Sequence, residues 1–160
     1  MIIMGIDPGS RKTGWGLIRH RAGKSEHLAH GTIVLGDKAP LPDRLVTLAQ
    51  ALDALLREHR PEACAVERIF SAKSARSALV LGQARGVAVC EIARAGVPIH
   101  EYSATEVKKS VTGSGGAAKA QVGRMVRVLL GQTQEFEENA ADALALALTH
   151  GVAAQLAKYR

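Results

Sequence analysis

Hydrophobic and polar positions along the chain predict alternating strands and helices. Ile2–Ile6 is a short apolar run that leads into Asp7 and a Pro-Gly pair, a pattern typical of a buried strand followed by a tight turn. Two further apolar runs, 13–19 and 28–35, are separated by the polar, glycine-containing segment 19–24, which is typical of a hairpin loop. The start of the chain therefore predicts an antiparallel meander of three strands.

The next segments predict a crossover that ends in a second acid. Leucines spaced four and three residues apart mark one face of a helix that begins near Pro42 and ends before Pro61. The apolar run Ala63–Val66 then leads to Glu67. A strand, a helix and a strand in this order place the second strand parallel to the first. We therefore expect Asp7 and Glu67 at the same edge of the sheet.

The second half of the chain predicts helices around one further strand. We expect helices over 72–95, 104–111 and 119–130, a strand over 97–101, and a last helix that opens at 135–139. In the first of these helices, Gly82 and Gly86 permit close packing, either against a second subunit or against the sheet of the same chain. Without a visible linker or repeat, the sequence predicts one α/β domain over residues 1–160, with a five-stranded mixed sheet flanked by helices.

The composition indicates an anionic partner. Lys and Arg number 21 against 15 Asp and Glu, which gives a net charge of +6, and a basic balance favours nucleic acid. Cys64 and Cys90 lie in apolar stretches without metal-site spacing, so we expect two reduced core residues of a cytosolic protein and no zinc site. With no visible secretory signal and no apolar run of the roughly 18 residues that cross a bilayer, we expect a cytoplasmic protein without membrane contact.

A glycine-rich loop excludes one class of enzyme. Residues 112–116 precede Lys119, but Ala118 and Ala120 occupy the positions where a phosphate-binding Walker loop has Gly and Ser or Thr. We therefore expect no nucleotide hydrolysis. A chain of 160 residues is also too short for the two-domain architecture of actin-like and sugar-kinase ATPases.

A third acid joins the two at the strand ends. Asn139 and Asp142 are three residues apart near the start of the last helix, so both project from one face. If Asp7, Glu67 and Asp142 converge, protonation or a metal cation must relieve their repulsion. Mg²⁺ prefers oxygen ligands, and two ions roughly 3.5 to 4 Å apart support phosphodiester hydrolysis. Taken singly, Asp7 is better explained as a turn cap and Asp142 as a helix-start acid, so only their conjunction favours catalysis.

Four motifs, in order along the chain, carry a resemblance to a known family. They are G-I-D-P-G-S-x-x-T-G at Gly5–Gly14, A-V-E-x-x-F at Ala65–Phe70, L-G-Q-A-R-G-V at Leu81–Val87 and A-A-D-A-L-A at Ala140–Ala145. Together they resemble the RuvC family of Holliday junction resolvases. The resemblance implies a ribonuclease H-like fold, a homodimer, and cutting of four-way DNA junctions in recombination and repair with Mg²⁺ or Mn²⁺, two ions per subunit. It also implies paired nicks that leave 5′-phosphate and 3′-hydroxyl ends, and a branch-migration helicase complex of the RuvA and RuvB type as partner.

Carried onto this sequence, the resemblance assigns the metal ligands. Asp7, Glu67 and Asp142 match three of the family's four ligands, whereas Asn139 stands where the usual D-x-x-D pattern has its first acid. An Asn carbonyl can still ligate a hard cation. We therefore expect a weakened ligand, an active enzyme that leans towards Mn²⁺, and stronger Mg²⁺-supported cleavage when Asn139 is replaced by Asp. If the missing carboxylate disables the site, the alternative is a junction-binding protein with weak or no catalysis.

Further positions are expected to contact the DNA. Lys108 and Lys119 match family lysines near the scissile phosphate, where a cation offsets the charge that grows in the transition state. Phe70 matches an aromatic residue that stacks on bases at the junction, and a core position is its ordinary alternative. Candidate phosphate contacts, each also compatible with plain surface, are Arg11, Lys12, Arg76, Lys109 and Arg124.

Overall fold

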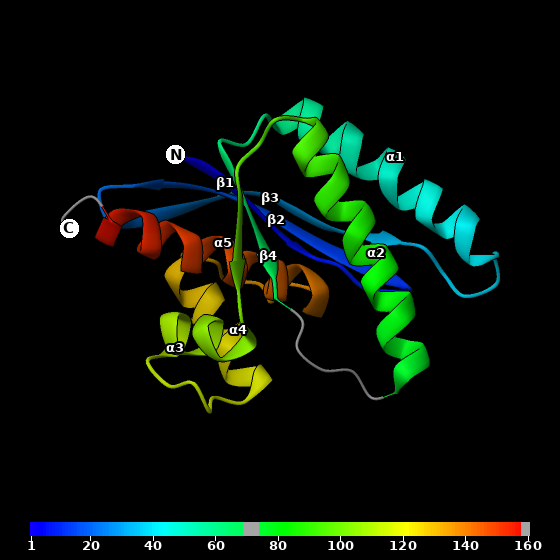
Figure 1. The fold of residues 1–160 in the computed structure, drawn as a ribbon. Coiled ribbons are helices and arrows are strands. Elements are labelled where there is room, and N and C mark those ends of the chain that lie inside the picture. The colour runs from blue at the N-terminus through cyan, green and yellow to red at the C-terminus, as the bar shows by residue number, and fades with distance from the viewer. Residues whose placement is uncertain (69–73, 158–160) are drawn as a thin grey trace.

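The computed structural model describes residues 1–68 and 74–157, which are arranged around a five-stranded sheet (Figure 1). The strands, in the spatial order β3-β2-β1-β4-β5, are β1 Ile2–Asp7, β2 Lys12–Arg21, β3 Lys24–Val34, β4 Ala63–Glu67 and β5 Ile99–Tyr102. β1, β2 and β3 form an antiparallel meander, while β4 runs parallel to β1 and β5 parallel to β4. The predicted mixed sheet, with its meander and its crossover, is confirmed.

The helices of the described chain begin close to where the pattern predicts them. They are α1 Leu41–His59, α2 Ala75–Arg94, α3 Ala104–Thr112, α4 Lys119–Leu129 and α5 Glu138–Ala157. α1 carries Pro42 in its first turn, where the missing N–H of proline costs no helical hydrogen bond. α2 begins three residues later than predicted, after Ser74, whose hydroxyl accepts a hydrogen bond from the backbone N–H of Ser77 and so caps the helix.

The hairpin between β2 and β3 is tighter than the sequence predicts. Ala22 and Gly23 have φ angles of 50° and 78°, and Arg21 pairs directly with Lys24. Two consecutive positive φ angles are the signature of a two-residue type I′ turn. β3 therefore begins at Lys24 and not at residue 28, and its polar start is tolerated because β3 is an edge strand of the sheet.

Helices cover both faces of the sheet (Figure 1). Successive residues of β1 point to opposite faces, as in any strand. Ile3 packs in one cluster with Leu144 of α5 and with apolar residues of α3 and α4. Met4 packs in the other with Leu48 of α1 and Ile92 of α2. β1 is therefore covered on both sides, as its continuous apolar run predicts.

Helix α5 lies against the sheet backbone itself. A Cβ atom at Gly5 would lie 1.8 Å from the main-chain oxygen of Ala143, and one at Gly14 would lie 1.9 Å from that of Asn139. These distances are far inside van der Waals contact, so only glycine fits at these two positions. The two glycines set how closely the start of α5 approaches the ends of β1 and β2.

Among the described residues, α5 is the helix whose length and composition would also suit a membrane span. It has 20 residues, and its most apolar window has a mean hydropathy of 1.2, with 61% of that window buried inside the protein. Residues 143–151 of α5 form a continuous buried stretch, and the helix packs on β1 and β2. A central core helix accounts for this hydropathy, which the sequence pattern alone did not bring out.

Two expectations for α2 are settled by its orientation. Ala84, Ala88 and Ile92 face the core, whereas the sites of added Cβ atoms at Gly82 and Gly86 have no described atom within 4 Å. The assignment of this helix to the core is therefore confirmed, whereas burial of Gly82 and Gly86 against the sheet of the same chain is wrong. The prediction of two core cysteines is correct for Cys64 and wrong for Cys90, which is exposed on α2.

Candidate active site

Two acids lie side by side where β1 and β4 end. The parallel register pairs Ile6 with Val66, so Asp7 and Glu67 follow at the same level. This confirms the predicted position of both residues at one edge of the sheet. The carboxyl ends of parallel strands are the usual place for a site in an α/β fold.

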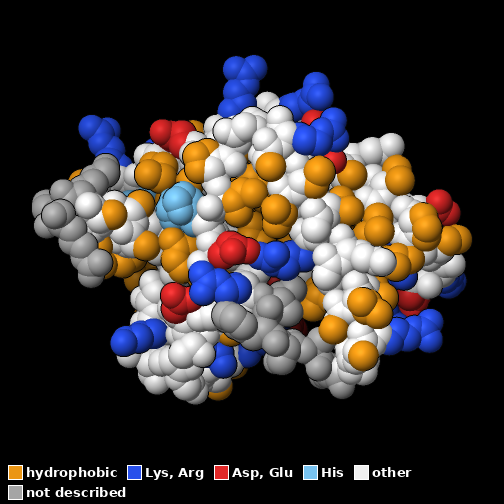
Figure 2. Space-filling view, in the orientation of Figure 1, with side chains coloured by type: hydrophobic (Ala, Val, Ile, Leu, Met, Phe, Trp, Pro, Cys, Tyr) orange, Lys and Arg blue, Asp and Glu red, His pale blue; other side chains and the backbone are white. Residues whose placement is uncertain are grey.

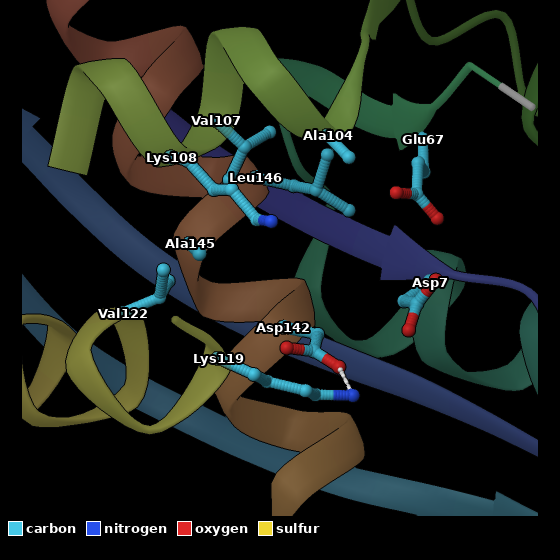
Figure 3. Close-up of a pocket in the computed structure, with 10 residues that line it drawn as sticks. All are labelled: Asp7, Glu67, Ala104, Val107, Lys108, Lys119, Val122, Asp142, Ala145 and Leu146. Carbon is cyan, nitrogen blue, oxygen red and sulfur yellow. Dashed lines mark ion pairs between the residues drawn. The ribbon is translucent and has the colours of Figure 1, made fainter. Parts of the chain in front are cut away.

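Asp142 of α5 brings a third carboxylate to the same cavity. The cavity has a volume of about 290 Å³ and is lined by residues from β1, β4, α3, α4 and α5. Its charged lining residues are Asp7, Glu67, Lys108, Lys119 and Asp142, and its apolar ones are Ala104, Val107, Val122, Ala145 and Leu146. Figure 3 shows the five charged side chains around one common space. Segments far apart in sequence thus converge as the pattern of acids predicts.

Burial and mutual repulsion make these acids weaker than free carboxylic acids. Burial, followed by the charges of Glu67 and Asp142, raises the pKa of Asp7 to about 7. Burial also raises the pKa of Glu67 and that of Asp142. A group of carboxylates that resists ionisation is one that a cation would stabilise.

Lys119 is the cation nearest to Asp142. Its Nζ lies 2.8 Å from Oδ2 of Asp142 (Figure 3) and 2.5 Å from Oε1 of Glu138. Although burial opposes it, the hydrogen bonds that Lys119 donates to both carboxylates raise the pKa of its ammonium. Lys119 is the first residue of α4, as predicted, and Lys108 points into the cavity from α3.

Asn139 lies beside the site with its side chain turned elsewhere. Its main-chain oxygen contacts Gly14, the residue that pairs with Asp7 across β1 and β2. Its side-chain Nδ2 donates a hydrogen bond of 2.6 Å to Oε1 of Glu137, and Asn139 is not among the residues that line the cavity. The structure therefore brings Asn139 next to Asp7 but does not point it into the cavity with Asp142.

The donor set fits a divalent cation by its chemistry. Asp7, Glu67 and Asp142 supply hard carboxylate oxygens, which Mg²⁺ and Mn²⁺ accept, and burial first and neighbouring carboxylates second raise their pKa values. Within residues 1–68 and 74–157, no three acidic, histidine or cysteine side chains lie close enough together to form a ready coordination shell. The site therefore suits a divalent cation by the type of its donor atoms and by the cavity that they share.

The candidate DNA contacts are distributed over the surface. Arg124 lines a second groove of about 430 Å³, which shares Lys119 and Asp142 with the cavity. Arg11 pairs with Asp37 at 3.8 Å and Lys12 with Glu137 at 3.9 Å, while Arg76 and Lys109 are exposed. Figure 2 shows basic side chains scattered over the face in view, with acidic ones between them. Phe70 lies outside the described residues.

Two residues next to the acids were not singled out from the sequence. Arg85 of α2 donates from Nε to the main-chain oxygen of Glu67 at 3.0 Å, and its guanidinium also pairs with Glu101 of β5. The side chain of Arg85 is only 22% exposed, and this burial is visible in the structure and not in the sequence. Glu138 is the second such residue, because its carboxylate and that of Asp142 meet at the ammonium of Lys119.

Comparison of the sequence with known proteins gives one consistent family. The family model for the crossover junction endodeoxyribonuclease RuvC matches residues 3–150. A protein of that name from Marinobacter nauticus is 50% identical over 149 residues, which is 93% of this chain and 85% of the relative. Another from Citrifermentans bemidjiense is 46% identical over 150 residues, 94% of this chain and 92% of the relative.

Comparison of the fold points the same way. The structure of Thermus thermophilus RuvC matches with a TM-score of 0.90 at 33% identity, over 98% of this chain and 97% of that one. T. thermophilus RuvC in complex with a Holliday junction substrate matches with a TM-score of 0.88 at 31% identity, over 98% and 96% of the two chains. The ribonuclease H-like fold is thereby confirmed, and the chain belongs to the RuvC family of crossover junction endodeoxyribonucleases.

Proposed function

We propose that this chain is a divalent-metal-dependent endonuclease that resolves four-way DNA junctions by paired, symmetric nicks in homologous recombination and DNA repair. One observation carries the proposal: Asp7, Glu67 and Asp142 line a single cavity together with Lys108 and Lys119. Family membership supports it, because relatives 46–50% identical are named crossover junction endodeoxyribonucleases.

The acids are proposed to hold the metal. RuvC nucleases are in general dependent on divalent metal ions, and we assign Mg²⁺ or Mn²⁺, two ions per subunit, to Asp7, Glu67 and Asp142. Asn139 is proposed as a weak fourth ligand, although its amide is bonded to Glu137 in this structure and would have to turn towards the cavity. When bound, the ions supply positive charge for hydrolysis of a phosphodiester to 5′-phosphate and 3′-hydroxyl ends. The protein's own part is to fix three acids from three different elements around one space.

The two lysines are proposed to act on the phosphate. Lys119 is held between Asp142 and Glu138, and Lys108 enters the same cavity from α3. A cation held near the scissile group offsets the negative charge that develops in the transition state. The ion pair with Asp142 also keeps the ammonium of Lys119 at the cavity wall.

The outer contacts are proposed to hold the junction. Phe70 stacks on a base, an interaction worth roughly 1 to 3 kcal/mol, and the phosphate contacts are Arg11, Lys12, Arg76, Lys109 and Arg124. Because each phosphate contact releases counterions, binding should fall steeply with salt. Arg124 is the best supported of these contacts, since its groove continues from the cavity.

The assembly is proposed to be a homodimer that works in the cytoplasm with a helicase complex of the RuvA and RuvB type. Residues 1–160 form one nuclease domain, and a two-fold axis would place two such sites on symmetric strands. The exposed face of α2 around Gly82 and Gly86 supports its assignment to the dimer contact, because no described atom of the same chain covers these glycines.

A junction-binding protein without catalysis is the competing function, and the nuclease names of the relatives do not favour it. A synthetic mobile four-way junction, incubated with Mg²⁺ or Mn²⁺, separates the two. Wild-type protein should make symmetric nicks, and Asp7→Asn should bind the junction without nicking it. If the wild-type protein binds the junction tightly but makes no nicks with either metal, the protein is a junction-binding protein and not a nuclease.

A further inference from the structure

Arg44 of α1 joins two segments of chain that meet next to β1. Its Nη1 donates hydrogen bonds to the main-chain oxygen of Ser10 at 2.8 Å and to that of Gly36 at 3.3 Å. Ser10 belongs to the turn that follows Asp7, and Gly36 lies between β3 and α1. One guanidinium nitrogen therefore bridges the turn after the first acid of the cavity and the segment that leads into α1.

The turn after the acid is held at three successive residues. The backbone N–H of Gly9 donates to Oγ1 of Thr13, a fully buried residue, at 3.3 Å. The main-chain oxygen of Arg11 accepts from two successive backbone N–H groups that begin at Leu35, at 2.8 and 3.1 Å. The middle residue, Ser10, is held by the guanidinium. The turn therefore depends on this side chain for the central one of its three attachments.

The position of Arg44 is unfavourable for stability. The residue is half-buried, and its Nε is buried without a hydrogen-bond partner in the described structure. Within the described part of the chain, both acceptors of its side chain are main-chain oxygens, and no carboxylate is among them. A buried donor without an acceptor and a half-buried charge without a counter-charge both disfavour folding. An apolar side chain of similar length would avoid both costs, so stability alone does not explain an arginine here.

The bridge lies outside the cavity but acts on residues of the site. Arg44 is not among the residues that line the cavity. Ser10 follows Asp7 by three residues, and the proline between them stiffens the link because its ring fixes φ. The same turn leads into Arg11 and Lys12, which are proposed phosphate contacts. A shift of the turn would therefore reach both the acid and these two basic residues.

We propose that Arg44 is a positioning residue for the nuclease reaction: it fixes the turn that follows Asp7 and thereby holds the carboxylate of Asp7 in place at the end of β1. Arg44 acts through the main chain of the turn and touches neither the substrate nor the reacting atoms. The inference rests on the nuclease function proposed above.

Arg44→Met separates positioning from stability, because methionine has a similar length but no hydrogen-bond donor. Single-turnover cleavage of a synthetic four-way junction at saturating protein should fall by about 10- to 100-fold, since a small misplacement of a catalytic group is costly. The urea midpoint should stay at or above the wild-type value, because the unpaired charge and the orphan donor are gone. Arg44→Lys, which keeps a donor, should recover part of the rate.

Hydrogen exchange without DNA or metal measures the turn itself. In Arg44→Met the amides of Gly9, Leu35 and Gly36 should exchange about tenfold faster, because local opening becomes easier when an attachment is lost. Amides in the middle of β1 should keep their wild-type rates. Arg57→Met is the matched control on the same helix, with a side chain 78% exposed and an ion pair to Asp53 at 2.9 Å; it should change neither cleavage nor exchange in the turn.

Each result decides the matter. Wild-type cleavage by Arg44→Met, unchanged exchange in the turn, or a loss of cleavage no larger than the loss of folded protein overturns the positioning role while the nuclease function stands. If the wild-type protein makes no nicks, the nuclease function itself fails, and the positioning role fails with it. Slower cleavage with faster exchange and an undiminished urea midpoint establishes the role.

Discussion

The main-chain oxygen of Glu67 accepts a 3.0 Å hydrogen bond from Nε of Arg85, so a residue of α2 fixes the end of the strand that carries an acid of the cavity. The same guanidinium pairs with Glu101 on β5, the next strand. Arg85 therefore ties two strand ends to the helix that also carries Gly82 and Gly86. Any shift of α2 would reach Glu67 through this side chain.

Replacing Arg85 with Ala should lower the rate of junction cleavage by on the order of 10- to 100-fold, because a small misplacement of a catalytic group is costly. Junction affinity should stay nearly unchanged, since Arg85 points to Glu67 and Glu101. Single-turnover cleavage and a binding titration separate the two effects. Arg85→Lys should recover part of the rate. Arg94→Ala is the matched control on the same helix, with an ion pair to Glu91 and a side chain 69% exposed; equal losses in both variants would contradict the prediction.

Gly14→Ala should destabilise the protein by about 1–3 kcal/mol, because the new methyl group would overlap the main chain of Asn139 and push α5 outward. The cleavage rate should fall by more than the loss of folded protein explains, because α5 carries Asp142 and its displacement moves this acid. Urea unfolding and cleavage rates measure the two effects. Gly123→Ala on α4 has open space around it and should stabilise by up to about 1 kcal/mol through helix propensity. A neutral Gly14→Ala would show that α5 can move without cost.

A buried histidine should make stability depend on pH. Nδ1 of His150 on α5 shares a 2.8 Å hydrogen bond with the hydroxyl of Tyr102, and the His150 ring stacks on His100 with ring centroids 4.0 Å apart. Burial, followed by the charges of His100 and His20, lowers the pKa of His150 from 6.5 to about 4. Between these two pKa values His150 is protonated in the unfolded chain and neutral in the folded chain. The stabilisation is complete above pH 6.5 and is lost as the pH falls towards 4.

When the pH falls from 7 to 5, protonation of His150 in the unfolded chain should lower the free energy of unfolding by on the order of 2 kcal/mol. Other groups titrate in the same range, so the comparison is with His150→Gln, whose amide can still accept from Tyr102 but does not titrate. Urea unfolding at both pH values should show a larger loss in the wild type than in the variant. Equal losses would mean that His150 is not kept neutral by the fold.

Lys119→Met should reduce cleavage by on the order of 100-fold, as loss of a charge-stabilising group in an active site commonly does. The variant also leaves Asp142 and Glu138 without the ammonium that they share. Junction binding should weaken far less, because many other basic residues contribute. Cleavage at saturating protein measures the chemical step, and Lys38→Met, an exposed lysine elsewhere, is the control. Wild-type cleavage by Lys119→Met would exclude a role at the phosphate.

The placement of Asp7, Glu67 and Asp142 could be predicted because it follows from local rules. Apolar runs mark the two strands, the intervening helix makes them parallel, and the spacing of the last helix sets which face carries Asp142. Each of these signals acts over a few residues of sequence. The sheet and the position of Asp7 and Glu67 at one edge of it could therefore be derived before the structure was known, whereas the convergence of Asp142 with them was a hypothesis.

The side-chain directions at the edge of the site could not be predicted, because their partners are distant. Asn139 is turned by Glu137, which is itself held by Thr32, 105 residues away in sequence. Glu138 reaches Asp142 only through Lys119 of another helix. Cys90 shows the same limit: its apolar neighbours in sequence do not reveal that α2 turns it away from the core.

The contact of α5 with the sheet has a further consequence. At Gly5 and Gly14 main chain meets main chain with no side chain between them. Side chains can change rotamer and absorb a strain, whereas backbone atoms in contact cannot. This backbone contact thus fixes the separation of Asp142 from Asp7. Mutations that loosen the packing elsewhere in the core should leave the depth of the cavity unchanged.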